Sequence, residues 1–83
     1  DPSVGSMFKN PAGSFAGRLI EQAECKGMRV GNAEVSKVHA NFFVNHGGAR
    51  AKDILDLGDT VRERVQAKFG IGLELEIEIV GDE

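Results

Sequence analysis

A long amphipathic helix near the C-terminal end constrains this chain most. Apolar residues recur every three or four positions over about 18 residues, and Gly70 then provides a stop. The members of this apolar face are Ile54, Leu57, Val61, Val65 and Phe69. The sequence has 83 residues, enough for one small domain. Such a helix must therefore bury its apolar face against the few other elements that so short a chain can form.

In the segment after this helix, the apolar residues repeat with a different period. From Leu73 to Ile79, apolar residues alternate with three glutamates, Glu74, Glu76 and Glu78. A period of two is typical of a strand with one buried face. We expect the apolar side chains to face the core, and the glutamates to face water or something outside this chain.

The N-terminal part predicts a short extended segment followed by a helix. The segment around Met7-Phe8-Lys9 ends at Asn10-Pro11, because a proline biases the residue before it away from helix. Ser14 is suited to cap a helix that ends at Lys26-Gly27. The apolar face of this helix consists of Ala16, Leu19, Ile20 and Ala23.

The middle of the chain predicts short strands near 28–31 and 41–45, with a turn at Gly31-Asn32 and an irregular link through Ser36 and His39. Another turn follows at 46–48. The order is strand, helix, strands, helix, strand. The fold class expected from it is α+β, a small sheet with two helices packed on one face.

The composition and the spacing of particular residues exclude several classes of protein and of functional site. The chain has 13 acidic and 10 basic residues, for a formal net charge of -3, so we expect no nucleic-acid partner. It has neither the apolar run of a membrane helix nor the basic start of a signal peptide. Cys25 alone cannot build a disulfide framework, and His39 and His46 do not have the spacing of metal ligands. A cytoplasmic location fits best.

The residues taken alone leave the chemistry open. Ser6, Lys9 and Asn10 bring a hydroxyl, a cation and an amide together, which also describes an ordinary polar turn. The segment 13–17 could hold an anion at a helix start, although an N-cap with close packing at Gly17 explains it better. The spacing of the strand glutamates does not single out any one of them.

The run Gly5-Ser6-Met7-Phe8-Lys9-Asn10-Pro11 resembles a signature of the UDP-N-acetylenolpyruvoylglucosamine reductase family. Further blocks keep the family's order, and they are 16–21, 26–31, 35–36, 39–45, 69–71 and 73–76. The departures are Leu75, where the family usually has proline, and Glu78, where a basic residue is common. The resemblance covers nearly the whole chain, but it corresponds only to the C-terminal substrate-binding domain of a longer flavoenzyme.

The resemblance implies a function in peptidoglycan synthesis. Family enzymes use NADPH and FAD to reduce UDP-N-acetylglucosamine enolpyruvate to UDP-N-acetylmuramate. By alignment, Ser6 would donate the proton and Glu76 would assist at the enol. Asn10, together with Lys9, would bind the substrate.

The resemblance also implies what this chain lacks. Residues 1–83 would be a single domain without the FAD-binding domains, and Asp1-Pro2 looks like a cut within a longer chain. We expect the isolated domain to bind no FAD, to be inactive, and to self-associate through the surface that its own N-terminal domains would cover. The alternative is a small non-catalytic interaction or anion-binding module.

Overall fold

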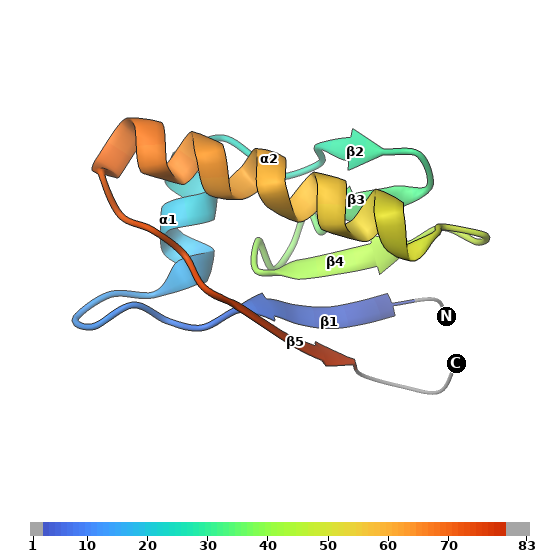
Figure 1. The fold of residues 1–83 in the computed structure, drawn as a ribbon, viewed down its shortest axis with the longest axis horizontal. Coiled ribbons are helices and arrows are strands. Elements are labelled where there is room, and N and C mark those ends of the chain that lie inside the picture. Colours follow the sequence, from blue (N-terminus) through green and yellow to red (C-terminus); the bar gives the residue numbers. More distant parts are fainter. Residues whose placement is uncertain (1–2, 80–83) are drawn as a thin grey trace.

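A computed structural model of the chain describes residues 3–79, with side chains described for residues 6–76. Helices and strands alternate in the order expected from the sequence, with one additional strand (Figure 1). The elements are β1 (Ser3–Phe8), α1 (Ala16–Gln22), β2 (Arg29–Val30), β3 (Ala33–Val35), β4 (Phe42–Asn45), α2 (Ala51–Phe69) and β5 (Leu75–Ile79).

The strands form one antiparallel sheet in the order β2-β3-β4-β1-β5. The first and last strands of the chain are therefore neighbours, as Figure 1 shows. Ser6 pairs with Glu78, and Phe8 pairs with Leu75. Leu75 is the first residue of its strand, a place that tolerates the proline usual in the family. This topology confirms the expectation that the N-terminal segment runs beside the C-terminal strand.

The core lies between the sheet and the helices. Figure 1 shows α2 running along the sheet with α1 at one end. The side chains that α1 and α2 bury belong to the predicted apolar faces, because only those side chains point inward. In the C-terminal alternation, Leu73 is buried as predicted, whereas Leu75 is 37% exposed. The largest fully buried side chains are Phe8, Phe43, Met7, Ile20, Leu57, Val35, Val61, Val65 and Cys25. The α+β fold with two helices is as predicted.

The ends of α1 differ from the prediction. Ser14 is not its N-cap; Phe15 holds that position without a side-chain bond to the helix. The helix also ends earlier than Gly27, because Glu24 adopts a left-handed conformation with φ 62°. Its N–H bonds the carbonyl of Glu21 at 2.9 Å, and the N–H of Cys25 bonds that of Ile20 at 3.2 Å. This pattern satisfies the terminal carbonyls of a helix, normally with glycine in the left-handed position.

One strand between the two predicted middle strands, β3, was not predicted, whereas the irregular link through Ser36 and His39 is confirmed. Ala33 and Glu34 are weak strand formers, so local preference did not reveal β3. The Gly31-Asn32 turn is confirmed as the hairpin between β2 and β3. Gly31 has φ 57°, and a Cβ there would lie 2.6 Å from Oδ2 of Asp53. The turn thus packs against the start of α2, where only glycine fits.

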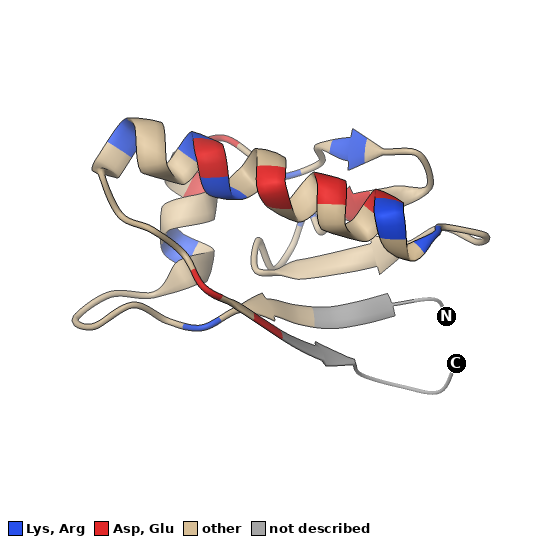
Figure 2. Ribbon diagram, in the orientation of Figure 1, with Lys and Arg blue, Asp and Glu red and all other residues tan. Residues whose placement is uncertain are grey.

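The outer surface of α2 carries charges of both signs, interspersed along the helix (Figure 2). Lys52 pairs with Asp56 and Arg62 with Asp59, each at 2.7 Å between the charged atoms. Such pairs at helical spacing are typical of a face in contact with water. Within residues 3–79, neither helix has the length and apolar character needed to cross a membrane.

Candidate active site

An irregular stretch of β1 lies at the centre of the site. The register between β1 and β5 shifts between Ser6 and Phe8. The N–H groups of both Met7 and Phe8 bond to Asn41, to its carbonyl oxygen at 3.0 Å and to its Oδ1 at 3.1 Å. Consecutive N–H groups in a regular strand point to opposite neighbours, so this stretch is bulged. The bulge explains how Met7 and Phe8 are both buried although they are adjacent.

The Ser6 side chain lies on the face of the sheet that points away from α2. Ser6 pairs directly with Phe42 of β4, and directly paired residues share a face. Phe42 is 37% exposed, whereas its neighbour Phe43 is fully buried in the core. We call the face of Ser6 and Phe42 the open face. The Ser6 hydroxyl is partly buried there, and Nδ2 of Asn41 donates a hydrogen bond to its Oγ at 3.0 Å.

Asn41, the residue bonded to this hydroxyl, also lines a groove of about 330 Å³. Its residues come from α1, the loop before it, and the loop that leads into β4 with the first residue of that strand: Asn10, Phe15, Gly17, Glu21, Val38, His39, Ala40, Asn41 and Phe42. Asn41 lines the groove and also bonds to Ser6, so the two features are continuous. Phe15 is 61% exposed and Val38 is 72% exposed, so this Asn10 groove combines polar groups with exposed apolar surface.

Asn10 lines the same groove as Asn41, the residue that bonds to Ser6. Oδ1 of Asn10 accepts a hydrogen bond from the N–H of Ala16 at 2.9 Å, so Asn10 satisfies the donor at the helix start that Ser14 was predicted to serve. A Cβ at Gly17 would lie 3.7 Å from the Cβ and N of Asn41, which confirms close packing at this glycine. With the Ala16 N–H occupied, the anion-binding interpretation of segment 13–17 loses one of its donors.

Lys9 and Glu76 lie further along the same pair of strands. Nζ of Lys9 is 3.7 Å from Oε1 of Glu74, and both side chains are exposed. The Lys9 N–H bonds the Glu74 carbonyl at 2.9 Å. Glu76 has an exposed side chain and precedes Glu78, the cross-strand partner of Ser6, by two residues. The sheet therefore brings the segments of Ser6 and Glu76 together, while the roles of both residues stay predictions.

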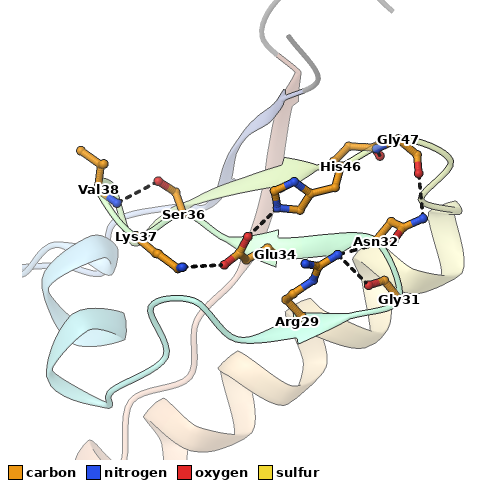
Figure 3. Close-up of polar contacts among 10 residues, drawn as sticks. Arg29, Gly31, Asn32, Glu34, Ser36, Lys37, Val38, His46 and Gly47 are labelled. Carbon is orange, nitrogen blue, oxygen red and sulfur yellow. Dashed lines mark hydrogen bonds and ion pairs between the residues drawn. The ribbon is translucent and has the colours of Figure 1, made fainter.

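Other ionisable groups form a separate cluster at the β2–β3–β4 end of the sheet (Figure 3). Nε2 of His46 lies 2.5 Å from Oε1 of Glu34, whose side chain is 12% exposed. Hydrogen bonding to His46 lowers the pKa of Glu34, burial opposes this change, and Lys37 adds to the lowering. This cluster joins β3 to the turn after β4. Its ionisable residues Glu34, Lys37 and His46 do not line the Asn10 groove.

Cys25 is fully buried among apolar side chains. Burial raises the pKa of its thiol, and the positive charge of Arg64 has a smaller effect in the opposite direction. This agrees with the prediction that the residue packs inertly rather than acting as a nucleophile. Across the described part of the chain, no three His, Cys, Asp or Glu side chains are grouped as a metal site would require.

The fold and the site define a small α+β domain with a polar site on its open face. The sequence matches, over residues 1–80, the family described as "UDP-N-acetylenolpyruvoylglucosamine reductase, C-terminal domain". The chain belongs to this family.

Relatives at high identity agree with this assignment. The chain is 59% identical over 80 residues to UDP-N-acetylenolpyruvoylglucosamine reductase 2 of Symbiobacterium thermophilum, a match covering 96% of this chain and 26% of the relative. It is 59% identical over 78 residues to the UDP-N-acetylenolpyruvoylglucosamine reductase of Chloroflexus aurantiacus. That match covers 94% of this chain and 26% of the relative. The crystal structure of the UDP-N-acetylenolpyruvylglucosamine reductase of Thermus caldophilus matches with a TM-score of 0.74 and 53% identity, over 92% of this chain and 26% of that one. The chain thus spans about a quarter of the length of these proteins.

Sequence reasoning did not find Asn41 as the residue that links Ser6 to the groove. Asn41 was visible only as one letter of the block 39–45. Its bonds reach residues 33 and 35 positions away, so no local spacing rule detects them. An asparagine directly before a run of strand-forming residues was the available signal.

Proposed function

We propose that this chain is the substrate-binding and proton-donating domain of a UDP-N-acetylenolpyruvoylglucosamine reductase. The whole enzyme would be an NADPH- and FAD-dependent oxidoreductase that acts in the cytoplasm and makes UDP-N-acetylmuramate for peptidoglycan. Membership of the family supports the activity. The observation that carries the role of this domain is the Ser6 hydroxyl on the open face, bonded to Asn41, which also lines the Asn10 groove.

The Asn10 groove is the proposed place for part of the nucleotide sugar. Its volume of about 330 Å³ lies within the range of small-molecule sites. Asn10 and His39 supply polar groups, while the exposed ring of Phe15 and the side chain of Val38 supply apolar contact area. Lys9 lies in the same loop, and its ammonium could approach a diphosphate, since its partner Glu74 is itself exposed.

The flavin is assigned to the part of the protein outside this chain. Within the described residues, the groups around Ser6 are one amide and one hydroxyl, which suit contact with a substrate and not the cradling of a dinucleotide. When bound, the flavin supplies a hydride to the enolpyruvyl group. Ser6 would then donate its hydroxyl proton to the adjacent carbon, where negative charge develops. Proximity within a closed site makes such a weak acid effective.

Glu76 is the proposed group that stabilises the enol as it forms. Its exposed side chain could face a bound substrate at the edge strand β5. A carboxyl group stays protonated and able to donate a hydrogen bond when an apolar surrounding excludes water. That surrounding would come from the remaining domains, which we propose close over this edge of the sheet.

The Ser6→Ala substitution in the full-length protein tests the proton donor. Rapid-mixing absorbance should show flavin reduction by NADPH at the parent rate, because that half-reaction needs no proton from Ser6. Flavin reoxidation by the enolpyruvyl substrate should slow by about 10²- to 10⁴-fold, the usual contribution of a positioned acid. Thr60→Val, which removes a hydroxyl from α2 on the other side of the sheet, is the control and should leave both rates unchanged. Reoxidation of the Ser6 variant at the parent rate would refute the assignment.

Glu76→Gln tests the second role, with Glu74→Gln as its matched control on the same strand segment. The first substitution should slow reoxidation by about 10-fold or more, because an amide is a weaker donor to a developing negative charge. The control should change the rate by less than about 2-fold, since Glu74 pairs with Lys9 at the surface. Equal effects of the two substitutions would remove Glu76 from the mechanism.

A further inference from the structure

We infer that Asn41 is a positioning residue for proton donation: it fixes the direction of the Ser6 hydroxyl and stabilises the negative charge left on its oxygen. This inference rests on the proposed role of Ser6. Asn41 makes three side-chain hydrogen bonds, through Oδ1 to the N–H of Phe8 at 3.1 Å, and through Nδ2 to the carbonyl of Phe8 at 2.9 Å and to Oγ of Ser6 at 3.0 Å.

The backbone of Phe8 determines which way the Asn41 amide points. A backbone N–H can only donate, so the atom facing it must be the amide oxygen. A backbone carbonyl can only accept, so the atom facing it must be the NH₂ group. Rotating the amide by half a turn would place two donors together and two acceptors together. The second hydrogen of that NH₂ group is therefore the one directed at Ser6.

This orientation makes the Ser6 oxygen an acceptor toward Asn41. The hydroxyl hydrogen is not used in that contact, so it must point in another direction and is available to a substrate on the open face. In the proposed step, the O–H bond of Ser6 breaks and a C–H bond forms at the substrate carbon. The electron pair stays on Oγ, next to the Nδ2–H of Asn41, and a proton from solvent later restores the hydroxyl. A hydrogen bond to a charged oxygen is roughly twice as strong as one to a neutral oxygen.

Asn41 is held firmly enough to act this way. Its backbone carbonyl accepts from Met7, and Gly17 of α1 packs against its Cβ and N. The residue therefore connects the bulge of β1, the start of β4 and the helix α1. A supporting residue whose own position is fixed by several contacts can orient a reactive group.

A purely structural role is the competing explanation, because the bonds from Asn41 to Phe8 also hold the bulge in place. Both explanations predict that Asn41→Ala lowers stability. They differ in whether the effect on the reaction passes through the Ser6 hydroxyl. A double-mutant cycle separates them, since coupled residues are not additive.

The experiment uses the full-length protein with Ser6→Ala, Asn41→Ala and the double variant, and Asn45→Ala as control. Asn45 also caps a turn with its amide oxygen, in bonds to Gly47 and Ala49, so the control is chemically matched. For each variant, three quantities are measured: the rate of flavin reduction by NADPH, the rate of reoxidation by the enolpyruvyl substrate, and the urea midpoint of unfolding.

Asn41→Ala should slow reoxidation by about 10- to 100-fold in the parent. In the Ser6→Ala background, the same substitution should slow it by less than about 2-fold. The urea midpoint should fall in both backgrounds, because the bonds from Asn41 to Phe8 are lost in each. Asn45→Ala should lower the midpoint without a change in reoxidation. An equal loss of rate in both backgrounds would overturn the inference while leaving Ser6 as donor. A Ser6→Ala variant that reoxidises at the parent rate would instead refute the proposed function itself.

Asn41→Asp keeps the shape of the side chain, so it replaces Asn41→Ala as the test if the alanine variant does not fold. Its carboxylate would accept from the Ser6 hydroxyl and divert the proton from the substrate. Reoxidation should then be slow at neutral pH and recover as pH falls and the new carboxyl protonates. A pH profile parallel to that of the parent would contradict the inference.

Discussion

The two faces of the sheet use the same strands in opposite ways. Phe43 and Phe42 are adjacent in β4, yet Phe43 is fully buried in the core while Phe42 is 37% exposed on the open face. The Phe43 ring meets that of Phe8 edge to face, with ring centroids 6.4 Å apart. On the open face, the corresponding contact is a hydrogen bond between Asn41 and Ser6. Burial of apolar side chains stabilises the face of the sheet that packs against the helices. Side-chain hydrogen bonds fix the conformation of the open face.

This difference separates stability from function in the molecule. The helix face contains the side chains that a small domain needs for folding, because area removed from water is its main source of stability. The open face can carry a reactive hydroxyl and a groove, because its shape is fixed from behind by that core and locally by Asn41. Substitutions on the two faces should therefore have separable effects.

The largest expected effect is on the helix face. Phe43→Ala should lower the free energy of unfolding by about 3–5 kcal/mol, as removal of a buried phenylalanine leaves a cavity. Phe42→Ala should cost about 1 kcal/mol, because part of that ring is already in water. Urea denaturation of both variants measures the difference. Similar costs at the two positions would show that the open face contributes to folding as strongly as the core.

A smaller effect, of opposite sign, is expected at Gly58 in α2. A methyl group there would lie 3.7 Å from Cε of Met7 and 3.8 Å from atoms of Phe8 and Leu75, which are ordinary contact distances. Gly58→Ala should raise the free energy of unfolding by about 1 kcal/mol, since alanine favours a helix over glycine by that amount. Thermal unfolding of the variant tests this. A lower melting temperature would mean that α2 and β1 cannot accommodate even one methyl group.

The smallest effect concerns the Glu34–His46 contact. The pKa of Glu34 is lowered in the folded chain, so its ionised form stabilises the fold. That contribution is fully present above the ordinary value of 4.5 and is lost as pH falls through the lower, folded pKa. The stability difference between the parent and Glu34→Gln should be below about 1 kcal/mol at neutral pH and shrink as pH falls below 4.5. A difference that grows on acidification would contradict this sign.

The contrast between the buried face and the open face also determines what could be predicted from the sequence. The period of Ile54 to Phe69 predicted α2, and the alternation after Leu73 predicted β5, because burial on one face imposes those repeats. The strand β3 was missed because it is only three residues long, too short for its alternation of two buried residues around Glu34 to stand out as a period. The cap of α1 was misplaced because Asn10 reaches the Ala16 N–H from six residues away, where a local rule favoured Ser14.

Less of the candidate site than of the fold could be predicted from the sequence. No spacing rule identified Ser6 as reactive, and only the resemblance to a family singled it out. The contact between Ser6 and Asn41 joins residues 35 positions apart and depends on a bulge in β1, which has no local signature in the sequence. Hydrogen bonds between distant segments follow from the assembled sheet, so sequence patterns alone do not predict them.

A crystal structure of the full-length protein, with oxidised flavin and the enolpyruvyl nucleotide sugar bound, would test the central claim most directly. The distance to measure runs from Oγ of Ser6 to the substrate carbon that receives the proton. The account predicts about 3–3.5 Å, the separation of reacting atoms poised for transfer, with Asn41 still bonded to that oxygen. A substrate seated on the helix side of the sheet, or a Ser6 hydroxyl directed away from the carbon, would contradict it.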